Sequence, residues 1–308
     1  MRAAFFDSYG DADVLRVGEL PDPGPGPDDV VVRVRAAGVN PVDHKIRAGY
    51  LDGAFPSAFP VVPGWDVAGT VEAVGPAVTA FAVGDRVLGY VRKDHVQHGT
   101  TAELVRAAVR HLAPLPDGVG FEQAAALPLA GLTALQAVEA AGVQDRETAL
   151  VHAAAGGVGH LAVQLARLRG ARVLGTASEA NHASLRDLGA EPVTYGDGLA
   201  ERVRTVLGGA AVDASIDLVG GDALPASFAV TSDPGRVVSI TDAATVLGGG
   251  GRYVFVRPDS AQLAHLARLV EDGSLRVHVR GTYPLERVAE AHRDVEAGHG
   301  AGKVVVTV

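Results

Sequence analysis

A run of small residues near the middle of the chain has the types and the spacing to hold a phosphate-bearing ligand. It contains the pattern Ala-x-Gly-x-x-Gly, in which no side chain would keep the backbone away from a ligand. Where such a turn opens a helix, its backbone amides point at a pyrophosphate. We therefore predict a dinucleotide site, against the simpler alternative of a tight turn alone. The residues predicted to line this site are Ala154, Gly156, Gly157, Val158 and Gly159.

The residues around this turn predict the elements that position it. The apolar run at 149–152 is typical of a buried parallel strand, and from Val158 onward apolar residues recur at helical spacing. Strand-like and helix-like segments then alternate, which predicts right-handed crossovers and an α/β fold with a doubly wound parallel sheet. The predicted strands are 172–177, 192–194, 212–218, 236–240 and 253–256, and the predicted helices are 181–188, 199–207, 223–228 and 260–271.

The amino-terminal part of the chain has a different pattern. Short strand-like runs are separated by turns rich in glycine and proline, and the clear helical turn there is at 41–47. We predict a β-rich domain at 1–117, completed by a strand–helix–strand tail at 275–308, and a nucleotide-binding domain at 118–274. The glycine run at 248–251 predicts a flexible loop.

Composition excludes several classes of function. The formal net charge is -9, and no cluster of Lys and Arg interleaves with aromatic residues, which argues against a nucleic-acid partner. No apolar run approaches the roughly 18 residues that span a bilayer, so we expect no membrane association. A strand-like run at 3–6 stands where a signal peptide would be, so we expect a cytoplasmic protein. Cysteine is absent, which excludes disulfides, thiolate metal sites and cysteine nucleophiles.

Five segments in a fixed order resemble the medium-chain dehydrogenase/reductase superfamily, and within it the zinc-free quinone oxidoreductase group. The resemblance runs from the first strand to the closing GKVVVTV, and it implies a GroES-like β-rich domain and a Rossmann domain. The segments are AAGVNPVD (36–43), PGWDVAGTVEAVG (63–75), FAVGDRV (81–87), PLAGLTA (128–134) and VHAAAGGVG (151–159).

The chain departs from the zinc-dependent members of this superfamily at the metal ligands. In those relatives a cysteine, a histidine and a second cysteine hold the catalytic zinc, and the corresponding positions here carry Asn40, Trp65 and Leu129. Because catalytic zinc needs three protein ligands, we predict no metal site. His95 and His98 have a ligand-like spacing but no carboxylate or thiolate partner, so we interpret them as surface or hydrogen-bonded histidines.

NADPH is the predicted cofactor. An acidic residue about 20 positions after the glycine turn normally binds the ribose 2′-hydroxyl of NAD, and Ala177 stands at the position that we align with it. Ser178 and Asn181 are predicted to donate to a 2′-phosphate, with helix capping as the alternative. Tyr195 matches a family tyrosine near that phosphate. The remaining predicted cofactor-binding residues are Asn40, Thr133, Phe255 and Val256.

A metal-free site favours acceptors that already take up electrons well. Quinones and small α,β-unsaturated carbonyls accept hydride at a conjugated carbon while charge flows onto an oxygen. Asn40 is predicted to donate a hydrogen bond to that oxygen. Asp43 is predicted to relay a proton or order the region, with capping of the next turn as an equal alternative. Tyr50 and Trp65 are predicted to wall the pocket, with core packing an alternative for Trp65.

Two other functions stay open. Enoyl reductase domains of polyketide synthases share the VHA-x-x-GGVG segment, but they carry a lysine where this chain has Asn181, which puts reduction of a carrier-bound enoyl thioester in doubt. Other proteins of this fold bind the cofactor without catalysis or catalyse non-redox steps. Acceptor-dependent turnover separates a reductase from a protein that only binds the cofactor.

The last strand of the predicted sheet bears on assembly. It is apolar at 253–256 and lies at an edge, where unpaired amides are a template for pairing with another strand. Two copies meeting there about a two-fold axis would form one continuous sheet, as relatives in this superfamily do. We therefore predict a homodimer, with a covered edge and a monomer as the alternative.

Overall fold

The structure is a computed structural model that describes residues 1–298 and 300–308. Contacts between residues divide the chain into two compact units. Unit 1 consists of residues 1–129, 258–273 and 277–308, and unit 2 of residues 130–257 and 274–276. The predicted fold class, a GroES-like β-rich domain with a Rossmann domain, is confirmed.

Unit 1 is built mainly of strands. They are β1 (Arg2–Phe5), β2 (Arg16–Glu19), β3 (Asp29–Val39), β4 (Ser57–Val62), β5 (Asp66–Val74), β6 (Arg86–Tyr90), β7 (Val96–His98), β8 (Leu104–Ala108), β9 (Leu112–Pro114), β16 (Val279–Pro284) and β17 (Lys303–Thr307). Its helices are α1 (Pro41–Arg47), α2 (Phe121–Ala125), α9 (Ser260–Glu271) and α10 (Val288–Glu296), with 3-10 turns η1 (Ala12–Val14), η2 (Val109–His111) and η5 (Leu285–Arg287).

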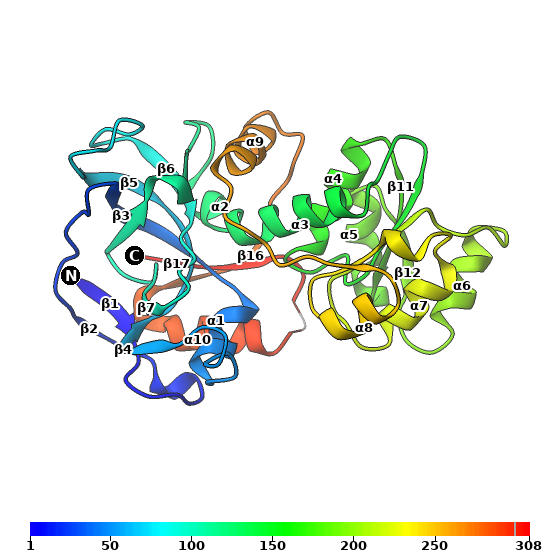
Figure 1. Cartoon of the computed structure of the whole chain (residues 1–308), viewed down its shortest axis with the longest axis horizontal. Coiled ribbons are helices and arrows are strands. Elements are labelled where there is room, and N and C mark those ends of the chain that lie inside the picture. The colour runs from blue at the N-terminus through cyan, green and yellow to red at the C-terminus, as the bar shows by residue number, and fades with distance from the viewer. Residues whose placement is uncertain (299) are drawn as a thin grey trace. The chain divides into compact units, whose positions relative to one another are not determined.

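Strand β3 organises the main sheet of unit 1 (Figure 1). The sheet has the order β16-β17-β3-β5-β6-β9, and β8 pairs with the first half of β3. The carboxyl end of β3 pairs on one side with β17 and on the other with β5, where Val39 lies opposite Val304 and Gly38 opposite Asp66. Residues that open β5 and β17 are therefore brought next to the residue that follows β3.

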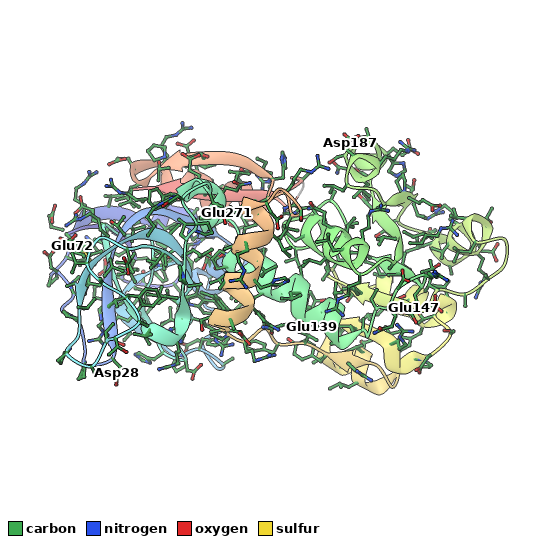
Figure 2. All side chains as sticks on the ribbon, turned by 90° about the horizontal axis from the view of Figure 1, so that it is seen from above. Asp28, Glu72, Glu139, Glu147, Asp187 and Glu271 are labelled. Carbon is green, nitrogen blue, oxygen red and sulfur yellow. The ribbon has the colours of Figure 1, made fainter. Side chains whose placement is uncertain are left out.

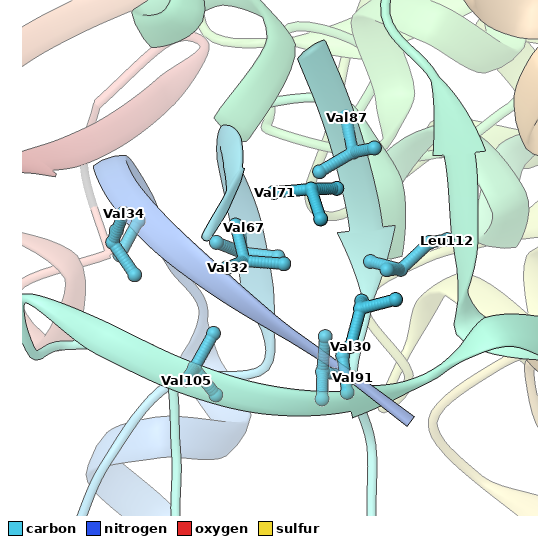
Figure 3. Close-up of a cluster of buried hydrophobic side chains, with 11 residues drawn as sticks. Val30, Val32, Val34, Val67, Val71, Val87, Val91, Val105 and Leu112 are labelled. Atoms are coloured by element: carbon cyan, nitrogen blue, oxygen red, sulfur yellow. The ribbon is translucent and has the colours of Figure 1, made fainter. Parts of the chain in front are cut away.

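Branched side chains fill the core of this sheet (Figure 3). Val30, Val32 and Val34 alternate along β3 and pack against Val67 and Val71 of β5. β-Branched residues suit a pleated, half-buried surface, and burying each one stabilises the fold by about 1.5–3 kcal/mol. The rigid sheet that results holds the ends of its strands in place.

Unit 2 contains a six-stranded sheet with helices along it (Figure 1). Its strands are β10 (Thr148–Val151), β11 (Arg172–Ala177), β12 (Glu191–Thr194), β13 (Ala214–Asp217), β14 (Val237–Ser239) and β15 (Arg252–Tyr253). Its helices are α4 (Gly159–Leu168), α5 (His182–Asp187), α6 (Leu199–Val206), α7 (Ala223–Val230), α8 (Ala243–Gly248) and most of α3 (Pro128–Ala140), with 3-10 turns η3 (Glu179–Asn181) and η4 (Pro234–Arg236).

The strand order in unit 2 confirms the predicted doubly wound sheet. All five pairings are parallel, and the order is β12-β11-β10-β13-β14-β15. The chain moves outward from β10 to β12 and then returns to β13 on the other side of β10. In such sheets ligands bind beyond the carboxyl ends of the strands at the point where the direction reverses. That point lies between β10 and β13.

The division into units differs from the predicted domain boundaries at three segments, of which the shortest, residues 275–276, lies in unit 2. Residues 118–129 and 258–273, which the sequence assigned to the nucleotide-binding domain, belong to unit 1. The reason is packing, since α2 contacts β3 and β5, and α9 contacts β9. The tail at 277–308 also belongs to unit 1, where β17 lies between β16 and β3.

The prediction for the final strand is confirmed in its place at the edge of the sheet, but it is wrong in its length. Strand β15 ends at Tyr253, and the Val254 amide beyond it donates to the Ser239 carbonyl at 2.9 Å. The chain then turns away because the Gln136 side chain binds both backbone groups of Arg257, at 3.0 Å each. The predicted loop at 248–251 is also too long, because Gly248 closes α8.

Two features of the whole chain bear on possible partners. Among the described residues, none of the helices combines the length and the apolar character needed to cross a lipid bilayer. Acidic side chains such as Glu72 in unit 1 and Asp187 in unit 2 lie at exposed positions (Figure 2). The negative charge is therefore spread over both units.

Candidate functional site

The predicted glycine turn lies at the reversal point of the unit 2 sheet, between the end of β10 and the start of α4. Gly159 opens the helix, and a Cβ atom there would lie 2.2 Å from the Ala153 carbonyl oxygen and 2.7 Å from the Ala154 Cα. Only glycine fits, because both of these neighbours are backbone atoms. The missing side chain lets α4 begin directly against the turn, as a dinucleotide fingerprint requires.

The turn presents unused amides at the start of α4. Within the described residues, the amides of Gly157, Val158 and Gly159 donate to no protein acceptor. A helix amino terminus carries partial positive charge and amides that lack an intrahelical partner, so it binds anions. The three amides, and the space that a Cβ at Gly159 would fill, suit the pyrophosphate of a dinucleotide.

A buried polar network holds the turn in shape. Ala153 has a φ of 50°, a left-handed conformation that is unfavourable for alanine. Its amide donates to Thr176 Oγ1 at 3.1 Å, and the Ala154 amide donates to the Thr176 carbonyl at 2.9 Å. His152 lies 2.8 Å from Ser227 Oγ through its Nε2, and burial lowers the pKa of His152 to about 4, so its ring is neutral.

The residues predicted to bind the 2′-phosphate come from neighbouring strand ends. Strand β12 pairs with β11 so that Thr194 lies opposite Ala177, which brings Tyr195 to the same edge as Ser178. Asn181 Nδ2 donates to Ser178 Oγ at 3.2 Å, and the Tyr195 side chain is 60% exposed. Ala177, which we align with the acidic residue that binds the ribose of NAD, thus lies next to polar side chains.

The sequence did not indicate the cation at this edge. The Arg202 guanidinium, in the first turn of α6, donates to the carbonyls of Thr194, Gly196 and Asp197 at 2.9, 3.0 and 2.6 Å. It therefore shapes the loop that carries Tyr195. The sequence does show an arginine in the helix after the predicted third strand. Its side chain folds back on the loop that carries Tyr195, and residue spacing alone does not predict this.

Three other predicted cofactor residues have different settings. Thr133 is buried within α3. Phe255 is 55% exposed and Val256 is half-buried, and both lie in the segment that leads from β15 to the clamped Arg257. Their contact with a cofactor stays a prediction.

Unit 1 contains a group of four buried polar side chains, which we call the buried polar cluster. Its members are Asn40, Asp43, Asp66 and Lys303, and none is more than 4% exposed. Asn40 follows β3 and precedes α1, Asp66 opens β5 and Lys303 opens β17. The pairing of β3 with both strands brings them together. The sequence predicted Asn40 and Asp43 as site residues.

Hydrogen bonds join all members of the buried polar cluster. Asn40 Nδ2 donates to Asp66 Oδ2 at 2.9 Å, and Asn40 Oδ1 accepts from Lys303 Nζ. The Asn40 backbone amide donates to Asp43 Oδ2 at 2.7 Å, so the predicted capping role of Asp43 is present. Asp66 Oδ1 accepts from the Leu129 amide at 2.8 Å. Lys303 Nζ lies 4.0 Å from Asp66 Oδ2.

Burial changes the ionisation of these groups. Burial raises the pKa of Asp43 to about 7, against the hydrogen bond from the Asn40 amide, and the charge of Asp66 contributes to this rise. Burial likewise raises the pKa of Asp66 to about 6, although Lys303 and Asn40 oppose this. Burial lowers the pKa of Lys303, while the two carboxylates raise it. Lys303 Nζ therefore lies among two carboxyl groups, of which Asp43 has the higher pKa.

The two predicted pocket aromatics are placed differently. Trp65 is 5% exposed, and its ring packs edge-on against Phe55 and Tyr90 with centroids 5.4 and 6.2 Å away. Core packing, the alternative for Trp65, is thus present. Tyr50 is 79% exposed in the turn after α1. Contact of either ring with a substrate stays a prediction.

Lys303 and Asp66 are the members of the buried polar cluster that the sequence did not predict as site residues. Each is a charged residue that opens an apolar strand, in KVVVT and in DVAGTVEAV. Such a position is usually read as the solvated end of a strand. A weak signal existed, but only the pairing of β17 with β3 places the ammonium beside Asn40.

Comparisons with known proteins agree with this arrangement. The model of the alcohol dehydrogenase GroES-like domain matches residues 26–117, and the model of the zinc-binding dehydrogenase matches residues 188–306. The solved quinone oxidoreductase from Coxiella burnetii is 34% identical, with a TM-score of 0.90 over 100% of this chain and 99% of that one. The chain belongs to the medium-chain dehydrogenase/reductase superfamily. It falls in the quinone oxidoreductase-like group, and it is an oxidoreductase.

Members of this superfamily that resemble the chain differ in their named cofactors. The chloroplastic NADPH-dependent alkenal/one oxidoreductase of Arabidopsis thaliana is 35% identical, over 99% of this chain and 79% of the relative. A solved NAD-dependent alcohol dehydrogenase is also 35% identical, with a TM-score of 0.90 and full coverage of both chains. The choice of cofactor therefore has to be argued from the residues of this chain.

Two of the three positions aligned with zinc ligands, Asn40 and Leu129, are joined here through a third residue. Asp66, which follows Trp65, connects the Asn40 amide to the Leu129 backbone. In the part of the chain that the structure describes, no group of three or more His, Cys, Asp or Glu side chains is arranged to hold a metal ion. Independence of zinc stays a prediction, and it rests on the residue types at these three positions.

Proposed function

We propose that the chain reduces quinones or small α,β-unsaturated carbonyls with NADPH, by hydride transfer that needs no metal. The observation that carries this proposal is the hydrogen-bonded chain from Asn40 through Asp66 to the Leu129 amide. An amide donor, rather than a Lewis acid, stands at a former ligand position. Acceptors that are already electrophilic suit such a donor, because less charge has to be stabilised.

The residues of unit 2 support NADPH as the cofactor. When bound, it supplies the hydride. The turn at Gly156 and Gly159 suits the pyrophosphate, and Ala177 puts no carboxylate near a 2′-phosphate. Ser178 and Tyr195 carry hydroxyl groups at the same strand ends. The name of the alkenal/one oxidoreductase agrees with this choice of cofactor and with an enone substrate.

In unit 1 we assign Asn40 the role of binding the acceptor. Its Nδ2 group has two hydrogens, one of which is directed to Asp66. The second is assigned to the oxygen that gains charge as the acceptor is reduced. Preorganised donors of this kind stabilise developing charge because they need no reorganisation during the reaction. Asp43 holds the Asn40 backbone, and its pKa of about 7 leaves it about half protonated at neutral pH.

Turnover with a quinone tests this function and the cofactor together. We expect NADPH to be oxidised in the presence of 1,2-naphthoquinone, with a higher kcat/KM than for NADH. Ala177→Asp should lower kcat/KM for NADPH by roughly 10- to 100-fold through repulsion of the 2′-phosphate. Ala177→Asn is the matched control, since it adds the same volume without the charge.

The outcomes separate the alternatives. A protein that binds NADPH but shows no acceptor-dependent oxidation with quinones or enones would be a binding protein. Equal or better use of NADH by the unmodified chain would contradict the NADPH preference while leaving the reductase in place.

For assembly we propose a homodimer that forms at the β15 edge of unit 2. The edge strand is short, so its backbone offers few ladder bonds, and the exposed Phe255 ring adds apolar surface beside it. Val254 is unsuitable as a test position because its amide already bonds to Ser239. Sedimentation equilibrium at micromolar concentration should give twice the chain mass of 31.5 kDa.

A substitution at the edge can test where the dimer forms. Phe255→Glu should shift the equilibrium toward the monomer, because it places a charge on the two-fold interface. Tyr50→Glu, an equally exposed aromatic position in unit 1, is the control and should leave the mass unchanged. A single-chain mass for the unmodified protein would contradict the proposal.

A further inference from the structure

The buried polar cluster contains two charged residues to which the chemistry above gives no task. Lys303 is 4% exposed and Asp66 is fully buried. Burying an ammonium and a carboxylate costs several kcal/mol per ion, and an apolar pair of similar volume often serves a fold at least as well. Their place in the core therefore calls for an account beyond packing.

The contacts of these two residues converge on one amide. Lys303 Nζ donates to Asn40 Oδ1, and it also lies 3.3 Å from the Val39 carbonyl. Asp66 Oδ2 accepts from Asn40 Nδ2 at 2.9 Å. Each end of the Asn40 side chain thus meets a partner of the opposite hydrogen-bonding type.

These contacts allow one orientation of the amide. Lysine can only donate and a carboxylate can only accept, so a flipped Asn40 would set its NH2 group against the ammonium and its oxygen against the carboxylate. Asp66 is itself fixed, because its other oxygen accepts from the Leu129 amide at 2.8 Å. The second Nδ2 hydrogen is therefore held in one direction.

The ammonium also acts on the strength of the donor. A cation at Oδ1 draws electron density from the amide, and in a low-dielectric interior this strengthens the hydrogen bond that Nδ2 donates. The effect is largest when the acceptor of that bond is an oxygen that is gaining charge. Lys303 would thus favour the transition state over the bound substrate.

We propose that Lys303 and Asp66 are positioning residues, which orient and polarise the Asn40 amide as the donor to the acceptor oxygen. This inference rests on the proposed function, in which Asn40 contacts the acceptor. Lys303, which lies 263 positions from Asn40 in the sequence, would thus affect kcat through Asn40.

A double-mutant cycle on kcat tests the inference. Asn40→Ala should lower kcat by roughly 100-fold, as loss of an oxyanion donor does. Lys303→Met should lower kcat by roughly 10- to 100-fold, as loss of a supporting hydrogen bond does. The double variant should match Asn40→Ala alone, because Lys303 acts through Asn40. The Kd for NADPH should stay within about twofold in Lys303→Met, since Lys303 is not among the residues predicted to contact the cofactor.

Arg47→Met is the matched control for loss of a buried cation in the same unit. The Arg47 side chain is fully buried and bonds to the Gly10 carbonyl and to Glu296, outside the buried polar cluster. It should lower the stability without lowering kcat. Trp65, the one tryptophan of the chain, reports the folding of unit 1 in each variant. If Lys303→Met is unfolded, Lys303→Gln keeps a donor to Oδ1 and should show a smaller loss with the same non-additivity.

A second readout does not depend on turnover. The side-chain amide of Asn40, assigned by difference from Asn40→Ala, should give two resolved NMR signals that are protected from exchange in the unmodified protein. These signals should shift and lose protection in Lys303→Met, and change less in Lys303→Gln. Unchanged signals, or multiplicative effects on kcat in the cycle, would overturn the positioning role. Absence of turnover in the unmodified protein would instead overturn the proposed function, while the NMR result still decides the positioning.

Discussion

Replacing Gly159 by alanine is expected to remove measurable NADPH binding. The new Cβ would lie 2.2 Å from the Ala153 carbonyl oxygen and within 3 Å of the Ala154 backbone, so the turn or the first residues of α4 must move. Overpacking of this kind costs about 1–3 kcal/mol of stability. Because the amides of the turn would no longer converge on the pyrophosphate, the affinity should fall more than the stability.

Titration of the cofactor fluorescence and thermal unfolding measure the two effects of Gly159→Ala. Gly248→Ala is the matched control in the same unit, because nothing lies within 4 Å of the added Cβ and Gly248 closes α8. It should bind NADPH normally and unfold at the same or a slightly higher temperature. Normal NADPH affinity in Gly159→Ala would mean that the turn at 154–159 is a tight turn and no cofactor cradle.

Asp43→Asn is expected to stabilise unit 1 increasingly as the pH rises. The folded protein holds the pKa of Asp43 at about 7, above the ordinary value of 3.8. Between about pH 4 and 7 the unfolded chain loses this proton while the folded one keeps it, so stability falls as the pH rises through this window. Below about pH 4 this group does not lower the free energy of unfolding. Above about pH 7 it lowers that free energy by its full amount, about 4 kcal/mol.

Urea unfolding followed by Trp65 fluorescence at pH 5 and pH 8 measures this effect. The free energy of unfolding of Asp43→Asn minus that of the unmodified protein should increase by about 3 kcal/mol between the two pH values. Asp28→Asn, at an exposed carboxylate of the same unit, should give the same difference at both pH values. A constant difference for Asp43→Asn would show that this carboxyl group is ionised in the folded protein at pH 5.

Local patterns were sufficient for the nucleotide turn and for most elements of unit 2. The strand at 172–177 in unit 2 has the predicted limits, and so does the helix at 260–271, which belongs to unit 1. Small residues at 154–159 also mark a place where backbone must approach backbone closely, which the Cβ distances at Gly159 bear out. Such features depend on neighbours in the sequence, so the sequence states them directly.

The end of β15 shows where local patterns failed. Tyr253, Val254, Phe255 and Val256 have strand-like side chains, yet the strand stops at Tyr253. The deciding contact is the Gln136 side chain, which binds the backbone of Arg257 from 121 positions away. Propensity does not report competition from a distant hydrogen-bonding partner.

The sequence by itself determined the two-part α/β architecture, the family and the residues of the nucleotide turn. It also determined that the former zinc-ligand positions carry Asn40, Trp65 and Leu129. Only the tertiary structure decided that Lys303 and Asp66 complete the surroundings of Asn40, because antiparallel pairing of β3 with β17 and β5 joins them. The physical reason is that a charged residue at a strand end is normally solvated, and its ionisation and its partners change only when the sheet encloses it.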